Sequence, residues 1–160
     1  MFKLISSKKG VVLWVLLFCI LSLLAPDISL SANFFSELDI DEVSLKGHKL
    51  HIKGHTDLPP GSNLHIKVSI PNLDDNKGKD HDVKVHITPG NFFVMIDLPK
   101  EWNGGGIKFL TLKAIFDPHE QPKNVKAKVG KNGENLKGPK VKAENGKKIM
   151  IAFKNVIFLS

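Results

Sequence analysis

Residues 47–67, GHKLHIKGHTDLPPGSNLHIK, hold two short segments in which apolar and polar residues alternate. One segment is Lys49–Lys53 and the other begins at Leu64. Successive side chains of a β-strand point to opposite faces, so strict alternation is typical of a strand with one buried and one solvated face. The Pro-Pro-Gly at 59–61 is a turn signal. This stretch therefore predicts two strands joined by a tight loop.

The same alternation continues along the chain after residue 32. The last segment, 148–159, changes its apolar parity near Lys154-Asn155, which predicts a β-bulge or a change of sheet there. No stretch of ten or more residues holds a helical period. Besides Lys49–Lys53, we expect strands over 39–45, 64–70, 83–87, 92–98, 110–116, 125–129 and 148–159.

Turn residues separate nearly all of these segments, at intervals of about ten residues. Seven to eight short strands with this spacing predict an all-β fold, an antiparallel immunoglobulin-like β-sandwich. A small barrel is the alternative fold.

The first thirty-two residues resemble a secretory signal peptide rather than part of a fold. Lysines near the start precede the apolar run Val11–Leu24, and small residues follow, which predicts cleavage after Ala32. The run is shorter than the ~20 residues of a typical membrane span. We therefore expect an exported protein, periplasmic or extracellular, with a single domain over 33–160. An uncleaved N-terminal membrane anchor is the alternative.

Cysteine is absent from residues 33–160, because the chain's one cysteine, Cys19, lies in the apolar run. This excludes a disulfide, a thiol nucleophile and a thiolate metal ligand in the predicted domain. Export without cysteines fits a bacterial envelope protein.

Charge is distributed unevenly, and every basic residue is lysine. Residues 33–120 have ten lysines and thirteen acidic residues, a net charge of −3, whereas residues 121–160 have ten lysines and two acidic residues, a net charge of +8. The basic end predicts contact with an envelope protein, a glycan or an anionic surface. A solvated lysine-rich face is the alternative. Nucleic acid is not an expected partner, since arginine is absent. The expected binding surface is formed by Lys126, Lys128, Lys140 and Lys142.

Histidine is concentrated in residues 47–67, with four of the seven in the chain. If neighbouring strands bring His51, His65 and His86 to one face, three imidazoles could bind zinc or copper. The alternative is that these histidines share solvated faces with lysines, whose charge disfavours a bound cation.

Catalytic motifs such as Gly-x-Ser-x-Gly, Ser-x-x-Lys and His-Glu-x-x-His are absent from residues 33–160, so we expect neither an enzyme nor a cofactor. Trp102 and Phe93 could be exposed aromatics on a binding face. Phe93 and Met95 stand on the nominally solvated side of their strand, and we expect another part of the chain to cover them.

Two stretches, GHTDLPPGSNLHIKVSIP and FDPHEQPKNVKAKVGKNGENLKGPKV, resemble a group of small exported bacterial proteins. The resemblance implies an immunoglobulin-like sandwich outside the cytoplasm and carries no active-site residue. We therefore hypothesise an envelope module, binding or structural, with a metal-binding periplasmic protein as the alternative. The matching positions are Gly54, Thr56, Leu58, Pro59, Gly61, Gln121, Pro122, Val125, Gly130, Gly133, Leu136 and Gly138.

Overall fold

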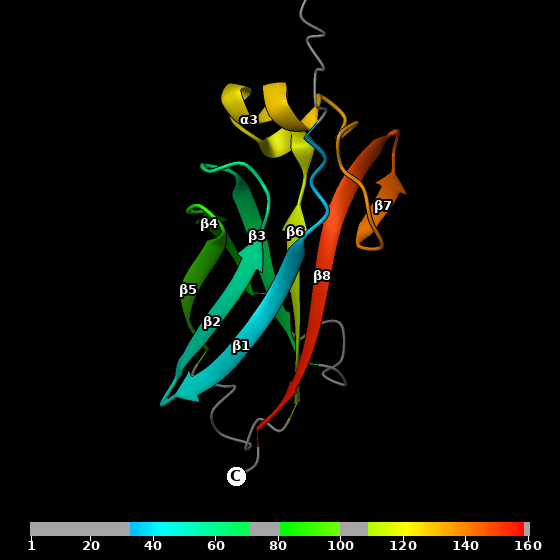
Figure 1. Ribbon diagram of the computed structural model, residues 1–160. Coiled ribbons are helices and arrows are strands. Elements are labelled where there is room, and N and C mark those ends of the chain that lie inside the picture. The colour runs from blue at the N-terminus through cyan, green and yellow to red at the C-terminus, as the bar shows by residue number, and fades with distance from the viewer. Residues whose placement is uncertain (1–32, 71–80, 100–108, 159–160) are drawn as a thin grey trace, which may run out of the picture. The chain divides into compact units, whose positions relative to one another are not determined.

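Two antiparallel sheets pack face to face around one apolar core in the computed structural model, which describes residues 33–70, 81–99 and 109–158 (Figure 1). This confirms an all-β sandwich. The three-stranded sheet has the order β1 (Leu38–Lys46), β2 (Lys49–Thr56), β5 (Asn91–Asp97). The five-stranded sheet has the order β4 (His81–His86), β3 (Asn63–Ser69), β6 (Phe109–Phe116), β8 (Lys147–Ile157), β7 (Val141–Glu144).

Several expectations fall on other parts of the chain. The signal segment 1–32, with Cys19, and the aromatic Trp102 lie outside the described residues. Among the residues that the structure does describe, no helix is long and apolar enough to cross a membrane.

Alternation decides which side chains enter the core. In β2, Leu50 and Ile52 are fully buried, while Lys49, His51 and Lys53 lie on the outer face. β3 repeats this pattern with Leu64, Ile66 and Val68, all fully buried. Removing such apolar surface from water contributes about 25 cal/mol per Å². The inner faces of both sheets therefore form the core, and their outer faces lie on opposite sides of the sandwich.

The loop between β2 and β3 is held by its own side chains. The Thr56 hydroxyl donates to the Glu37 carbonyl (2.6 Å) and accepts from the Leu58 amide (3.2 Å). The Ser62 hydroxyl donates to the Pro59 carbonyl at 2.6 Å. Gly61 has a φ of +82°, which favours glycine. These contacts give the Thr-x-Leu-Pro-x-Gly pattern a structural role.

The strand predicted over 125–129 is wrong, because this segment is the helix α3 (Lys123–Val129). Val125 and Val129 are both fully buried, and residues four apart share a helix face just as residues two apart share a strand face. Pro122 precedes the helix, and Gly130 ends it with a φ of +89°. The spacing of four residues between the valines fits one face of either a helix or a strand, but the flanking proline and glycine favour the helix.

The bulge predicted near Lys154-Asn155 is also wrong. β8 pairs with β6 in an unbroken register, from Ile157 opposite Phe109 to Met150 opposite Phe116. Its inward residues include Met150 and Ala152, so Phe153 and Ile157 project outward, 53% and 65% exposed. An irregular pairing occurs instead in β1, between Ile40 and Glu42.

Two further contacts fix the helical end of the sandwich. Gln121 follows the short helix η1 (Pro118–Glu120) and is buried against β3. Its side-chain oxygen accepts from the Asn63 amide (2.7 Å), and its nitrogen donates to the Asn63 carbonyl (3.0 Å). Asp117 forms an ion pair with Lys147 of β8. Burial raises the pKa of Asp117, but hydrogen bonds from Lys147 and the His119 amide outweigh it and hold that pKa below its usual value.

Candidate binding surfaces

The three histidines proposed as metal ligands do not meet. His51 belongs to β2 and faces outward from the three-stranded sheet, whereas His65 and His86 lie on strands of the five-stranded sheet. The outer faces of the two sheets are on opposite sides of the sandwich, so His51 and His65 cannot share an ion. In the described part of the chain, no group of three potential ligands is arranged to hold a metal.

His65 has a local role in the five-stranded sheet. Its Nδ1 lies 3.1 Å from a carboxylate oxygen of Asp82 on β4, and its Nε2 lies 2.5 Å from Glu120 of η1. The Nε2 contact is an ion pair without the alignment of a hydrogen bond. When protonated, His65 therefore links β3 to β4 and to η1.

His55 of β2 lies beside two carboxylates of β1. Its Nδ1 lies 2.7 Å from a carboxylate oxygen of Asp41, in the irregular part of β1, and its Nε2 lies 3.9 Å from Asp39. The hydrogen bond with Asp41 raises the pKa of His55 above its ordinary value. The imidazole therefore links β2 to β1, and its Nδ1 is already engaged by Asp41.

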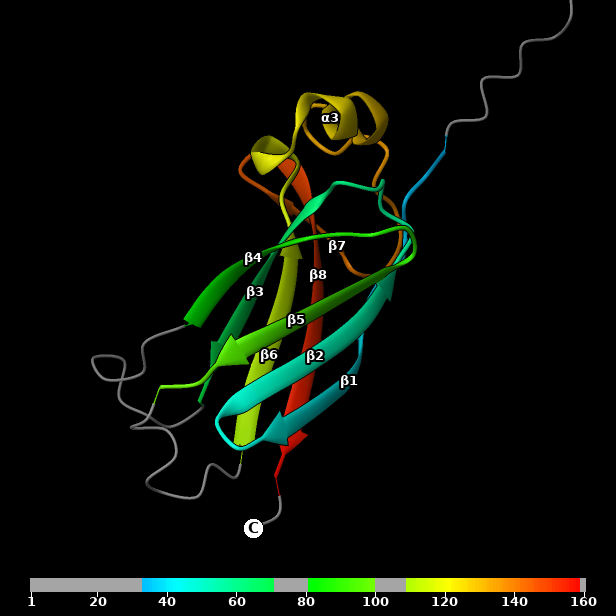
Figure 2. The same cartoon turned by 90° about the vertical axis from the view of Figure 1, so that its left-hand side faces the viewer.

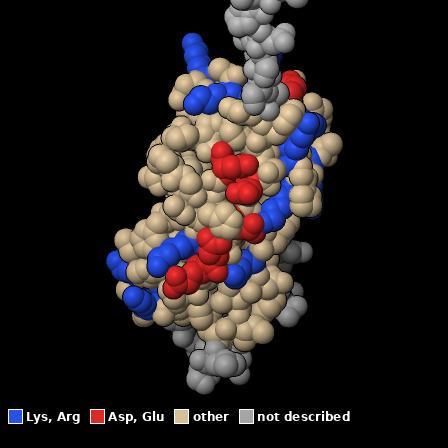
Figure 3. All heavy atoms as spheres, in the orientation of Figure 1, with Lys and Arg blue, Asp and Glu red and all other residues tan. Residues whose placement is uncertain are grey.

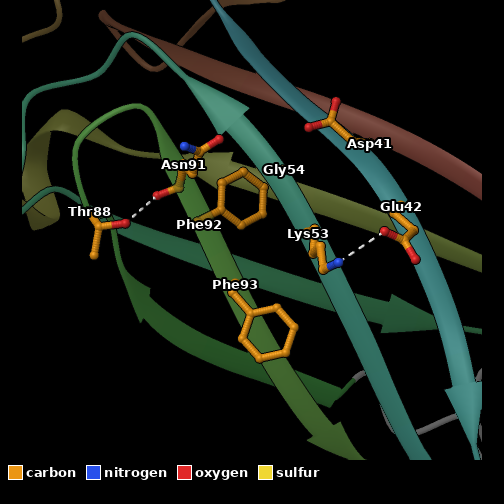
Figure 4. A pocket seen from close by; sticks show the side chains of 8 residues that line it. All are labelled: Asp41, Glu42, Lys53, Gly54, Thr88, Asn91, Phe92 and Phe93. Carbon is orange, nitrogen blue, oxygen red and sulfur yellow. Dashed lines mark hydrogen bonds and ion pairs between the residues drawn. The ribbon is translucent and has the colours of Figure 1, made fainter.

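A groove of about 360 Å³ crosses the three-stranded sheet at Gly54 (Figure 4). A Lys53–Glu42 ion pair of 3.2 Å lies on its β1 side, and a Thr88–Asn91 hydrogen bond of 2.9 Å lies on its β5 side. The third charged residue of the groove, Asp41, contacts His55. The lining residues are Asp41, Glu42, Lys53, Gly54, Thr88, Asn91, Phe92 and Phe93.

Two apolar side chains of β5 are exposed on the outer face beside this groove. Phe93 is 50% and Met95 57% exposed, so the prediction that another segment covers them is wrong. The imidazole of His51 lies beside Phe93, with 6.0 Å between the ring centroids. On the opposite face, by contrast, the exposed Phe153 has two ammonium groups over its ring, those of Lys113 at 5.6 Å and Lys142 at 5.3 Å.

The four lysines expected to form one binding surface take different roles. Lys126 and Lys128 lie in the last turn of α3. Lys140 forms an ion pair with Asp39 and donates to the Leu38 carbonyl at 3.0 Å, so it supports the fold. Lys142 is on β7, with its ammonium over Phe153. The structure therefore brings together two of the four.

A separate group of lysines gathers around α3. Within the described ranges, Lys123, Lys126, Lys128 and Lys131 have no ion pair, while Lys140 and Lys147 each pair with a carboxylate. We call these four residues the α3 lysines. Figure 3 shows lysine side chains at the α3 end and along β7, with a stripe of carboxylates over β1. Sequence reasoning included Lys123 and Lys131 in the basic end but could not separate them from the paired lysines.

Comparison of the chain with protein-family models, with curated proteins and with solved structures finds no match.

Proposed function

We propose that this chain is a non-enzymatic, exported module of the bacterial envelope with an immunoglobulin-like fold, which binds an anionic envelope surface through the α3 lysines. The strand orders β1-β2-β5 and β4-β3-β6-β8 support the fold assignment. They correspond to the A-B-E and C′-C-F-G arrangements of that fold class. The leader-like start of the sequence supports export.

The binding proposal rests on a difference among the C-terminal lysines, namely whether the ammonium group contacts a carboxylate or a carbonyl. Four of those on the rest of the domain neutralise carboxylates or bond to carbonyl groups, as Lys147 does with Asp117 and Lys154 with the Asp41 carbonyl. The other two, Lys137 and Lys142, lie over the rings of Phe34 and Phe153. The α3 lysines do neither within the described chain, and three of them are exposed. Several unneutralised ammonium groups on one short segment attract an anionic surface, at about 1 kcal/mol for each lysine close to it.

Binding to lipid vesicles tests this function. The protein should bind vesicles that contain anionic lipid, with binding weakened by salt because the attraction is screened. The double substitution Lys126→Glu and Lys128→Glu should abolish it. Binding to isolated wall polymer and not to vesicles would identify the wall as the anionic surface.

The matched control changes the net charge equally at another place. Lys46→Glu with Lys84→Glu alters two exposed lysines on β1 and β4, for which the described residues provide no ion pair. This control should bind as the parent protein does. Equal loss in both double variants would show that only net charge matters, and absence of binding at low salt would overturn the proposal.

A further inference from the structure

The outer edge of β5 is identified by two main-chain hydrogen bonds. The Thr56 amide donates to the Gly90 carbonyl (3.1 Å), and the Leu98 amide donates to the His48 carbonyl (2.9 Å). Both bonds join even-numbered residues at the ends of the β2–β5 ladder. Bonded and non-bonded pairs alternate in an antiparallel ladder, so the even-numbered residues of β5 bond to β2.

The odd-numbered residues of β5 therefore direct their amides and carbonyls away from β2. At Asn91 these groups are occupied, since its amide donates to the Thr88 carbonyl (3.3 Å) and its carbonyl accepts from the Thr88 hydroxyl (2.9 Å). For Phe93, Met95 and Asp97, no described residue provides a partner on this side. Three consecutive edge-facing positions thus have unpaired main-chain groups within the described structure.

The other sheet edges carry features that block pairing. At the edge of β1, Lys140 donates to the Leu38 carbonyl (3.0 Å) and Lys154 to the Asp41 carbonyl (2.8 Å). β4 has charged Asp82 and Lys84, and β7 is only four residues long. Charge, bulges and shortness are the usual means by which a protein prevents edge-to-edge pairing. β5 has no lysine, proline or bulge, its one charged residue, Asp97, lies at its end, and the two exposed side chains in its middle, Phe93 and Met95, are apolar.

We propose that β5 pairs antiparallel with β5 of a second copy of this chain, which joins two three-stranded sheets into one continuous sheet. Figure 2 shows β4 diverging from β5 beyond their connection, so no described strand lies along the outer edge of the later part of β5. Thr88 blocks the edge at Asn91, so the pairing must be centred closer to Asp97. A two-fold axis at Met95 meets this condition and pairs Phe93 with Asp97 of the other copy.

This register is self-complementary. It uses the amides and carbonyls of all three edge-facing residues in both copies. On the buried face, Val94 of each copy lies opposite Ile96 of the other. On the outer face, Met95 lies against its own counterpart. Like charges do not meet, because Asp97 faces Phe93 and already lies 3.4 Å from His48 and 3.8 Å from Lys49. The surface does not use the α3 lysines, so it can be tested independently of the proposed function.

The first test measures molar mass by light scattering over a wide range of concentrations, on the protein purified from an exporting host. The parent protein should dimerise as concentration rises, and Met95→Lys should remain monomeric because two ammonium groups would meet at the axis. Ser44→Lys, which adds the same charge to β1, should still dimerise. A parent protein that is monomeric at every concentration, or a Met95→Lys dimer, would overturn the proposal.

A second test reads the register by cross-linking, in a Cys19→Ser background. In a bonded antiparallel pair the Cα atoms lie ~5.5 Å apart, within the range that a disulfide spans. Met95→Cys should therefore give a covalent dimer on mild oxidation. Phe93→Cys, whose counterpart lies several residues away along the strand, should not. The reverse result, or equal cross-linking of both variants, would rule out the axis at Met95 even if Met95→Lys altered the fold.

Discussion

The two edges of the three-stranded sheet differ in how their main-chain groups are satisfied. β1 lies beside β8 (Figure 1), and lysines from the C-terminal part of the chain bond to its carbonyl groups. β5 has only Thr88 at one end, and its remaining edge-facing groups have no partner among the described residues. One sheet thus has one edge closed by side chains and one edge open.

This difference shows what closes an edge. Lys140 and Leu38 are 102 residues apart, and Lys154 and Asp41 are 113 apart, so the closure of β1 depends on tertiary structure. The net charge of the C-terminal part is high, yet part of that charge serves the fold. The open edge of β5 is marked instead by exposed Phe93 and Met95, which lie on the side of the strand that alternation assigns to solvent.

Gly54, in the central strand between the two edges, gives the largest expected effect. A Cβ atom at this position would overlap the Phe92 ring of β5 and the Asp39 carbonyl oxygen of β1. Gly54→Ala should therefore force both edge strands to move and lower the free energy of unfolding by about 2–3 kcal/mol. Urea denaturation with a fluorescence or circular-dichroism readout measures this.

The control for this substitution removes one of the two obstructions. Phe92→Leu shortens the side chain over Gly54, so the double variant should lose less stability than the sum of the two single variants. Additive losses would mean that the Asp39 main chain alone imposes the constraint. An unchanged midpoint for Gly54→Ala would contradict the close approach of both strands.

Prediction from sequence succeeded where all the apolar residues of a strand fell on one face. Leu64, Ile66 and Val68 leave no ambiguity about the inner face of β3, and they are fully buried. It failed where the apolar residues fitted two patterns. Val125 and Val129 suit a helix or a strand. In β8 the change of parity after Phe153 predicted a bulge, whereas Met150, Ala152 and Val156 share one parity and face inward without a bulge.

The candidate surfaces were less predictable for a related reason. Which lysines are unpaired depends on contacts between residues far apart in sequence, such as Lys147 with Asp117. Likewise, the separation of His51 from His65 depends on which sheet each strand joins. Alternation assigns a side chain to a face of its strand but not the strand to a sheet.

Opening the closed edge should have the next largest effect. Lys140→Met removes an ion pair with Asp39 and a hydrogen bond to the Leu38 carbonyl, so it should lower the free energy of unfolding by about 1–2 kcal/mol. Combined with Lys154→Met, it should also leave the β1 edge bare, and light scattering should then detect larger oligomers. Lys142→Met on β7 is the control and should change neither property, whereas equal losses in all variants would show a general effect of charge.

The smallest expected effect is a pH dependence of stability that arises at β1, the strand with the closed edge. The hydrogen bond that the imidazole donates to Asp41 raises the pKa of His55 above 6.5, and the charges of Asp41, Asp39 and Glu37 act in the same direction. A raised folded-state pKa means that His55 contributes stability fully below pH 6.5 and loses it as pH rises through the folded-state value. The imidazole is partly exposed, so the contribution should be less than about 1 kcal/mol.

His55→Gln should therefore be less stable than the parent protein between about pH 4.5 and about pH 6.5, where the imidazole is charged and the carboxylates are still ionised. At higher pH the two proteins should converge in stability. Asp41→Asn should reduce this pH dependence even with His55 present, because it removes the hydrogen bond that favours the charged imidazole. Thermal unfolding across this range measures both variants, and a difference that grew with rising pH would contradict the assigned direction of the pKa shift.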